Sequence, residues 1–332
     1  MNIGWIEISK KKYGGIIYNE QARKILSQRF DLELILCEPK MFKNIRYFRI
    51  PESLFYLLKL KGKKDLWIRD FYSTITLSFD KTEGKNLVVI HHLDFSGFPL
   101  ISQPIFNFLK NALFYHNLKR ADFIVTVSNY WQNYFLKRGY KNVYKIYNGF
   151  NLVDFNVSQK EVLEFIKKHH LIGKPIIYLG NCQKAKGVVE SYNYLKKLDA
   201  YLVTSGRAQV KIPAKNLELD YYDYLKLLKA SSVVLTMSKF KEGWCRTAHE
   251  AMLLKKPVIG SGLGGMKELL EGGKQIICSD FKELPKMVEY LINNPSLREK
   301  IGESGYNFAK DFTLERFQKE WTSLICKILG SL

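Results

Sequence analysis

Two glutamates with a fixed spacing are the residues of this sequence best suited to bind a ligand. Glu242 and Glu250 stand on either side of seven residues in the stretch KEGWCRTAHEAMLL, which begins at Lys241. Gly243 favours a loop, whereas the residues around Glu250 favour a helix. The N–H groups at a helix start attract a phosphate, and a carboxylate one turn further can accept hydrogen bonds from a ribose diol. Of two glutamates taken by themselves, however, one is more commonly just exposed to solvent and the other just stabilises the start of its own helix.

Apolar strands are expected on both sides of this pair. The run SVVLTM ends at Met237, and the run KPVIG ends at Gly260. Unbroken apolar runs are typical of strands buried on both faces of a parallel sheet. Open α/β sheets bind their ligands at the carboxyl ends of the strands. The position of Glu242 soon after a strand therefore favours a ligand site.

The same stretch resembles the signature of the family 4 retaining glycosyltransferases, which have the GT-B fold. That signature has two glutamates seven residues apart, then E-A-M, a P-V-I strand and a G-G turn. This chain has Ala251-Met252 after Glu250, then PVI at 257–259, Gly264-Gly265 and Glu268. The resemblance implies that Glu250 holds the ribose of a nucleoside-diphosphate sugar and that Glu242 contacts the sugar. It also implies that the donor diphosphate lies near Gly243, Trp244, Cys245 and Arg246.

A second stretch, IIYLGNCQKAKGV at 176–188, resembles the family's G-R-x(n)-K-G segment, whose Arg and Lys hold the diphosphate. Lys186 matches the family's lysine and is expected to neutralise charge on the departing phosphate. Asn181 stands where the family has arginine, and an amide brings no charge. Lys184 is a candidate for the missing charge and equally a solvated loop lysine. The loss of the arginine keeps open a catalytically weakened nucleotide-sugar-binding protein.

Histidines follow the strand NLVVI, which ends at Ile90. The family often has H-D at this strand end, so the resemblance implies that His91 contacts the donor sugar near the reacting carbon, with His92 in the place of the aspartate. The cluster of His91, His92 and Asp94 can alternatively bind a metal or be purely structural. No further His or Cys lies nearby in the sequence, so sugar contact is favoured and neither a metal nor another cofactor is expected.

Gly14 and Gly15 come after the first predicted strand and before a helical pattern. The family has a G-G loop at this place, where backbone amides approach a phosphate or a sugar closely. An ordinary turn explains a glycine pair equally well. The preceding lysines, Lys10, Lys11 and Lys12, are either a solvated loop or a contact for an anionic acceptor.

Strands and helices alternate along the whole chain and predict an α/β fold. Helical patterns cover Ile16–Arg29, Tyr130–Arg138, Val188–Lys197, Tyr221–Lys229 and Arg246–Leu254. The turn-rich segment 147–160 suggests a domain boundary. We predict two Rossmann-like domains facing across a cleft, residues 1–154 on the acceptor side and residues 155–312 on the donor side, with the helix 313–332 packing back on the first. In the segment 120–140, Ser128 is expected to cap the following helix.

The formal net charge of +20 and the pI of about 9.5 indicate anionic partners. Two stretches, Arg46–Lys64 and Pro104–Arg120, combine apolar residues with lysines; each is either a helix facing the core or one lying on an anionic membrane. No apolar run is long enough to cross a membrane, no secretory signal is visible, and five scattered cysteines suggest a reducing compartment. A cytoplasmic protein, soluble or peripheral on a membrane, is expected.

Taken together, the sequence predicts a metal-independent, retaining glycosyltransferase. Its donor is a UDP-, GDP- or ADP-sugar, and its acceptor is a hydroxyl of a glycan or of a lipid-linked glycan. Epimerases and glycan phosphorylases share the fold, but the compact glutamate signature argues against them. A nucleic-acid-binding protein explains the charge, yet no nucleic-acid motif is found, so nucleic acid is not expected as a partner.

Overall fold

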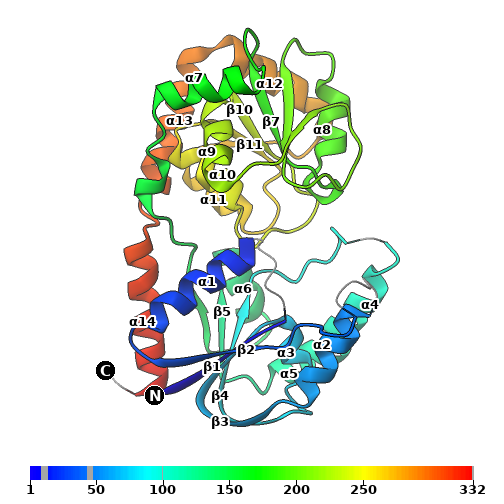
Figure 1. Ribbon diagram of the computed structural model, residues 1–332, viewed down its shortest axis with the longest axis vertical. Coiled ribbons are helices and arrows are strands. Elements are labelled where there is room, and N and C mark those ends of the chain that lie inside the picture. The colour runs from blue at the N-terminus through cyan, green and yellow to red at the C-terminus, as the bar shows by residue number, and fades with distance from the viewer. Residues whose placement is uncertain (9–13, 43–47, 99, 331–332) are drawn as a thin grey trace. The chain divides into compact units, whose positions relative to one another are not determined.

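The computed structural model describes residues 1–8, 14–42, 48–98 and 100–330. The chain forms two compact units (Figure 1). Unit 1 contains residues 1–95, 100–149 and 314–332, and unit 2 contains Phe150–Thr313 together with residues 96–98. The division at Gly149 lies a few residues before the boundary predicted at 154. The last helix, α14 (Leu314–Leu329), belongs to unit 1.

Unit 1 is built on a six-stranded parallel sheet in the order β2-β1-β3-β4-β5-β6. Its strands are β1 (Asn2–Glu7), β2 (Asp31–Leu36), β3 (Lys61–Arg69), β4 (Lys81–Ile90), β5 (Phe123–Thr126) and β6 (Val143–Lys145). Its helices, besides α14, are α1 (Gly14–Leu26), α2 (Arg49–Leu58), α3 (Phe71–Ile75), α4 (Gln103–Phe108), a π-helical segment (Leu109–Phe114), α5 (Tyr115–Leu118) and α6 (Asn129–Leu136).

Apolar packing explains where these elements lie. The last residues of β1 and β4 are buried in unbroken runs, as a sheet covered on both faces requires. Helix α14 packs on α1 through Phe317 and Trp321, whose rings meet the buried ring of Tyr18. Ser128 accepts a hydrogen bond from the Trp131 amide and caps α6, which confirms the predicted cap.

The stretch Arg46–Lys64 is not one helix. Within its described part, α2 ends at Leu58, and Lys61 begins strand β3, which the sequence reading missed. Lysines dominate the exposed start of β3, and this composition obscured the buried half of the strand. The stretch 104–120 is helical throughout its described length up to Leu118, with Phe114 and Leu118 in the core.

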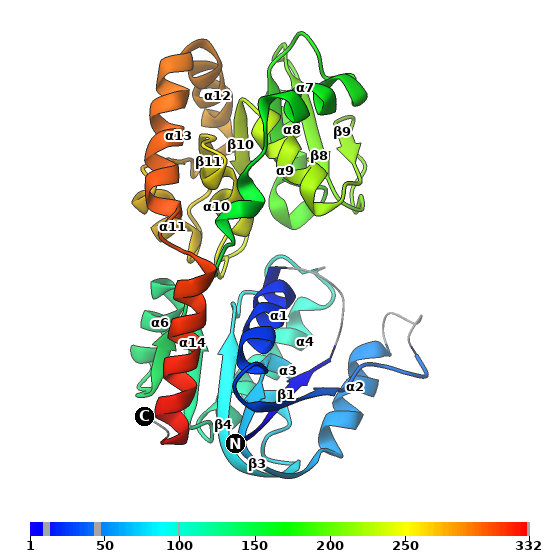
Figure 2. The same cartoon turned by 60° about the vertical axis from the view of Figure 1, so that its left-hand side comes forward.

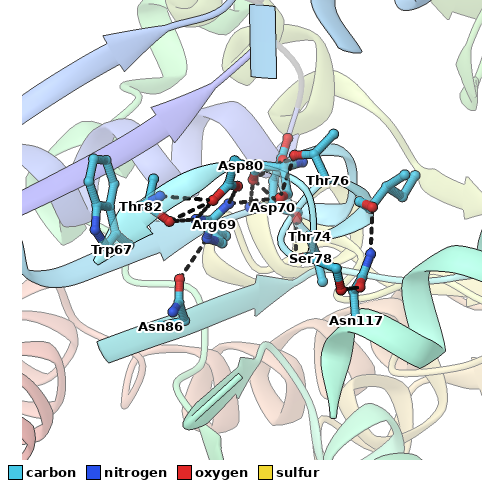
Figure 3. A network of polar contacts seen from close by, with 12 residues as sticks. Trp67, Arg69, Asp70, Thr74, Thr76, Ser78, Asp80, Thr82, Asn86 and Asn117 are labelled. Atoms are coloured by element: carbon cyan, nitrogen blue, oxygen red, sulfur yellow. Dashed lines mark hydrogen bonds and ion pairs between the residues drawn. The ribbon is translucent and has the colours of Figure 1, made fainter. Parts of the chain in front are cut away.

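A buried ion pair ties β3 to β4 and α3 (Figure 3). Arg69, at the end of β3, pairs with Asp80 at 2.8 Å, and both side chains are almost completely buried. All five guanidinium N–H groups have acceptors, which are Asp80, Thr82, Asn86 and the Ser73 carbonyl. Full hydrogen bonding is what makes a buried charge pair tolerable in a core.

Unit 2 has a second six-stranded parallel sheet, in the order β12-β11-β10-β7-β8-β9. Its strands are β7 (Ile176–Asn181), β8 (Tyr201–Ser205), β9 (Lys215–Leu217), β10 (Val233–Thr236), β11 (Val258–Gly260) and β12 (Ile276–Ile277). Its helices are α7 (Gln159–Lys168), α8 (Val188–Leu195), α9 (Tyr221–Ala230), α10 (Arg246–Leu253), α11 (Met266–Gly272), α12 (Leu284–Asn293) and α13 (Pro295–Ala309).

The strand order of unit 2 reverses at β7. The chain runs from β7 outward to β8 and β9 and then returns to place β10 on the other side of β7. Helices α8 and α12 contact each other, and α7, α9, α10 and α13 contact one another in series (Figure 2). A reversal of this kind leaves a crevice at the carboxyl ends of the two central strands, where open sheets bind ligands.

Candidate functional site

The centre of the candidate site is an ion pair at the carboxyl ends of β7 and β10. Lys186 Nζ lies 2.5 Å from Glu242 Oε1, and the Ser238 hydroxyl donates to the same oxygen at 2.5 Å. Burial lowers the pKa of Lys186, but the charge of Glu242 outweighs it, so the pKa is raised overall. Lys186 therefore remains an ammonium ion at neutral pH.

A glycine fixes the loop that carries Lys186. Lys184 and Lys186 lie in one turn of 3-10 helix, and Gly187 follows with φ of +69° at the start of α8. A Cβ on Gly187 would lie 2.2 Å from the Met237 carbonyl oxygen, so only glycine fits between the two strand ends. The K-G pair of the sequence thus has a steric cause.

A second glycine fixes Glu242. The backbone of Glu242 pairs with the 263–265 turn: its N–H donates to the Leu263 carbonyl, and the Gly265 N–H donates to its carbonyl at 2.9 Å. Gly264 has φ of +69°, and a Cβ there would lie 2.4 Å from the Glu242 carbonyl oxygen. The G-G turn of the signature therefore holds the first glutamate of that signature in place.

Glu250 is buried on α10 and faces three donors. The hydroxyls of Tyr221 and Tyr224 donate to its two oxygens at 3.3 and 3.2 Å, and Arg246 Nη2 lies 3.4 Å from Oε1. Burial raises the pKa of Glu250, and Arg246 and the tyrosines offset this only in part. A carboxylate surrounded by hydroxyl donors is suited to exchange them for the hydroxyls of a bound diol.

The segment between the two glutamates connects the Lys186–Glu242 ion pair to Glu250. Cys245 lies close enough to Lys186, Glu242 and Glu250 for each of them to affect the pKa of its thiol. Burial is the largest effect and raises that pKa to about 12, so Cys245 is a neutral thiol and not a nucleophile. Cysteine is not a helix-capping residue, so the first N–H groups of α10 are suited to an anion.

Trp244 and His249 form a structural pair behind this segment. Trp244 Nε1–H donates to His249 Nδ1 at 3.2 Å, which places the imidazole proton on Nε2, where it reaches the Ala309 carbonyl at 3.1 Å. The ring stacks on Phe150 at 4.1 Å. Burial lowers the pKa of His249 to about 3, so the imidazole is neutral. His249, which Trp244 orients, thus links α10 to the end of α13.

Asn181 and Lys184 differ in what surrounds them. Asn181 Oδ1 accepts hydrogen bonds from the Ser205 hydroxyl at 3.0 Å and the Tyr178 hydroxyl at 3.3 Å. Its side-chain carbonyl is therefore bound to side chains of β7 and β8. Lys184 is exposed beside the loop that holds Lys186. Either interpretation of Lys184, as a diphosphate ligand or as a solvated lysine, fits this position.

His91 and its neighbours belong to unit 1. His91 follows β4, its Nε2 lies 3.1 Å from Asn19 Oδ1 of α1, and its ring meets Tyr18 edge-on. Burial, and then the neighbouring His92, lower the pKa of His91 to about 3. His92 and Asp94 are half-buried beside it.

The other sequence candidates of unit 1 lie at the start of α1. Gly14 is exposed and Gly15 is half-buried there, whereas Lys10, Lys11 and Lys12 lie outside the described residues. Within the part of the chain that the structure describes, no three His, Cys, Asp or Glu side chains are arranged to hold a metal ion.

The sequence reading missed four contributors to these sites. In unit 2 they are Tyr221 and Tyr224, which lie three residues apart on one face of α9. In unit 1 they are Asn19 and Glu7. Burial raises the pKa of Glu7, while Arg23, at 3.4 Å, and Asn19 lower it in part. In unit 1 the sequence offered only an asparagine within a helical pattern and a glutamate near the end of the first predicted strand, and neither signal is specific.

Residues 159–308 match the family model of the glycosyl transferases group 1. The chain is 27% identical over 229 residues to an uncharacterized glycosyltransferase of Methanocaldococcus jannaschii, covering 63% of this chain and 62% of that relative's length. It is 22% identical over 183 residues, 53% of this chain and 50% of the relative, to the Campylobacter jejuni GalNAc-α-(1→4)-GalNAc-α-(1→3)-diNAcBac-PP-undecaprenol α-1,4-N-acetyl-D-galactosaminyltransferase.

Among solved structures, HepE from Anabaena in complex with UDP-glucose has a TM-score of 0.73 and 16% identity, covering 98% of this chain and 100% of that one. At this identity the likeness concerns the fold. The α/β architecture of GT-B type, with two Rossmann-like units, is confirmed.

Proposed function

We propose that this chain, whose residues 159–308 match the family model of the glycosyl transferases group 1, transfers a sugar from a nucleoside-diphosphate sugar to an acceptor hydroxyl with retention of configuration. The observation that carries the proposal is the grouping of Lys186, Glu242 and Glu250 around one helix start. A cation, a helix start and a carboxylate among hydroxyls match the diphosphate and the ribose of such a donor.

Each residue has a defined role in this proposal. Lys186 and the first amides of α10 hold the diphosphate, and Glu250 takes the ribose hydroxyls in exchange for those of Tyr221 and Tyr224. Glu242, freed from Lys186 by the incoming phosphate, contacts the donor sugar. The bond between the anomeric carbon and the phosphate oxygen breaks, and its electron pair leaves with the diphosphate. The acceptor oxygen bonds on the same face, and its proton passes to the departing phosphate oxygen.

The catalysis proposed is electrostatic. An ammonium ion and aligned N–H groups stabilise the negative charge that develops on the leaving diphosphate, and removing one such group typically costs about 10²–10³-fold in rate. These groups supply the stabilisation without a metal ion. In this proposal His91 contacts the sugar. Its imidazole is neutral, because burial keeps its pKa at about 3.

For the acceptor we propose a glycan, free or lipid-linked, handled at an anionic membrane surface. The name of the Campylobacter jejuni relative includes an undecaprenol diphosphate, which supports a lipid-linked acceptor. The net charge of +20 supports an anionic surface. Among the described helices, none has the length and apolar character that crossing a membrane requires.

A titration of UDP-, GDP- and ADP-sugars into the protein tests the donor site. One of the three nucleotides is expected to bind at a single site, and Glu250→Gln is expected to weaken that binding at least about tenfold, because it loses the charged acceptor of two hydroxyls. Glu271→Gln, an exposed glutamate of unit 2, is the matched control. Unchanged affinity in Glu250→Gln would show that the ribose assignment is wrong.

Asn181 supports a second candidate, a nucleotide-sugar-binding protein with weakened catalysis. Its amide, bound to Ser205 and Tyr178, brings no charge to the diphosphate. Tight donor binding without hydrolysis or transfer over a broad acceptor panel would support this candidate. Turnover by the unaltered chain would exclude it.

A further inference from the structure

The diphosphate site lacks the arginine that the resemblance to the family implies. Asn181 stands at that position, at the end of β7, and its Oδ1 is already bound by the hydroxyls of Ser205 and Tyr178. Lys186 brings positive charge from the loop that follows. A diphosphate carries more than one negative charge, and charged donors hold such oxygens most strongly. A second cation of unit 2 near the start of α10 would restore the balance of charge.

Arg246 is the first residue of α10, at the helix start to which the diphosphate is assigned. Its side chain is only 12% exposed, and its Nη2 lies 3.4 Å from Oε1 of Glu250, one turn further along the same face of the helix. Charge-assisted hydrogen bonds are typically about 2.7–2.9 Å long, so this ion pair is a loose one. The guanidinium therefore lies beside the carboxylate to which the ribose is assigned, and that carboxylate does not hold it tightly.

The ring of Phe150 packs against two residues of α10. The guanidinium carbon of Arg246 lies 4.5 Å from the centre of this ring, and the imidazole of His249 stacks on the ring at 4.1 Å with 16° between the two planes. Burial lowers the pKa of His249 to about 3, so this imidazole is neutral and adds no second positive charge. A cation–π contact uses the face of the ring and none of the guanidinium N–H donors. The contact thus orients Arg246 without competing with phosphate oxygens for those donors.

Phe150 is itself held firmly. Its side chain is 2% exposed, its backbone N–H donates to the Phe312 carbonyl at 3.0 Å, and its ring meets the Phe155 ring edge-on at 6.1 Å. Contact with a buried, fixed ring restricts where the guanidinium can lie. Phe150, Arg246 and Glu250 all belong to unit 2, so this unit contains the whole arrangement.

We propose that Arg246 supplies to the donor diphosphate the positive charge that is missing at Asn181, and that the Phe150 ring positions Arg246 for this role. The inference rests on the proposed function. As the ribose hydroxyls bind Glu250, the guanidinium turns from that carboxylate to the phosphate oxygens and keeps its contact with the ring. Arginine suits this exchange, because its planar fork of donors binds phosphate while its face rests on an aromatic ring.

Titration of UDP, GDP and ADP into the full chain tests the role of Arg246. Arg246→Met is expected to weaken the binding of the preferred nucleotide at least about tenfold, because charge-assisted hydrogen bonds to phosphate are lost. Lys267→Met removes an exposed cation of α11 and is the matched control, expected to bind like the unaltered chain. If one nucleotide binds the unaltered chain and Arg246→Met binds it as tightly, this inference alone is overturned. If none of the three binds the unaltered chain, the proposed function is contradicted as well.

A rescue variant separates the charge of Arg246 from a merely structural role. Arg246→Met combined with Asn181→Arg returns an arginine to the end of β7, where the family has it. This double variant is expected to recover the nucleotide affinity of the unaltered chain to within about threefold, because the diphosphate again meets two cations. A double variant that binds as weakly as Arg246→Met alone would show that Arg246 does not stand in for the missing arginine.

Phe150→Leu tests the positioning role. The variant keeps an apolar side chain but loses the ring face, so nucleotide binding is expected to weaken at least about threefold. The same change is expected to add little in a chain that already carries Arg246→Met, because the two residues act together. Phe155→Leu, at the neighbouring buried ring, is the matched control for lost packing and is expected to lower the thermal unfolding temperature without weakening nucleotide binding. Equal losses of affinity in the two leucine variants, or full additivity with Arg246→Met, would overturn the role of Phe150.

Discussion

At the scale of single residues, the candidate site pairs opposite charges that a donor must separate. Lys186 binds Glu242 directly, and Glu250 binds two tyrosines and Arg246. Each functional group thus already has a partner of the kind that a donor would supply or replace. Donor binding is expected to exchange these contacts, which keeps every charge compensated in a partly buried site.

Lys186→Met is expected to lower kcat by about 10²–10³-fold, because the ammonium ion that stabilises the leaving diphosphate is lost. Lys184→Met, two residues earlier and exposed, is the matched control and is expected to change kcat less than about threefold if Lys184 is a solvated lysine. Steady-state kinetics with the best donor measures both. Equal losses in the two variants would mean that Lys184 supplies the charge missing at Asn181.

Asn19 is expected to control the protonation of His91. Asn19→Asp places a carboxylate beside His91 Nε2, which raises the pKa of the imidazole toward its ordinary value of about 6.5. The variant is expected to show an imidazole titration between about pH 5 and 8 by NMR, and a matching inflection in the pH profile of kcat/KM. Gln28→Glu, at an exposed position two residues after the end of α1, should leave both profiles unaltered. A His91 that titrates near pH 6.5 in the unaltered chain would contradict this account.

At the scale of elements, two tight turns position the reactive side chains. Gly187 lets the β7–α8 loop pass the Met237 carbonyl, and Gly264 lets the turn after β11 pair with the backbone of Glu242. Lys186 and Glu242 are thereby held from different strand ends. The spacing of the sequence signature follows from these two backbone contacts.

Gly264→Ala tests this positioning. The new Cβ meets the Glu242 carbonyl oxygen and also forces a non-glycine residue to φ of +69°, so both activity and stability are expected to fall, stability by about 1–3 kcal/mol. Gly173→Ala is the control, because Gly173 has φ of +89° and open space around it. Urea unfolding and kcat are measured for both. A loss of activity in Gly264→Ala no larger than that in Gly173→Ala would contradict the positioning role of Gly264.

The sequence predicted the elements that depend on local pattern. The helices that carry Glu250 and follow Lys186 begin and end within two residues of their predicted limits, because apolar periodicity and flanking glycines are local signals. Strand β3 and the partners Tyr221, Tyr224 and Asn19 were missed. A lysine-rich strand start hides its buried half, and hydrogen bonds between distant segments leave no trace in the spacing of residues.

At the scale of the whole molecule, buried neutral histidines couple folding to pH. His249 and His91 each have a pKa of about 3 in the folded chain, against about 6.5 in an unfolded one. Between these pH values the unfolded chain binds more protons at these histidines than the folded chain does. Their contribution to the free energy of unfolding is therefore complete above about pH 6.5 and is lost as the pH falls. The acid sensitivity of the fold is thus set partly by residues beside the candidate sites.

His249→Gln tests this coupling. An amide can keep the hydrogen bonds to Trp244 and Ala309 but does not titrate, so the variant is expected to lose about 2 kcal/mol less stability than the unaltered chain between pH 7.5 and pH 5. Denaturant unfolding at several pH values gives the free energies. His116→Gln, at an exposed position, should follow the unaltered chain. Parallel pH curves for His249→Gln and the unaltered chain would contradict the assignment.

The most direct test of the central claim is the configuration of the first product. The chain is incubated with the nucleotide sugar that binds best and with a panel of hydroxyl acceptors, and NMR follows the anomeric signal at early times. An α-linked donor is expected to give an α-linked product, and Glu242→Gln is expected to lower the rate strongly while the donor still binds. An inverted product, or no transfer and no hydrolysis from any UDP-, GDP- or ADP-sugar, would contradict the proposed retaining transfer.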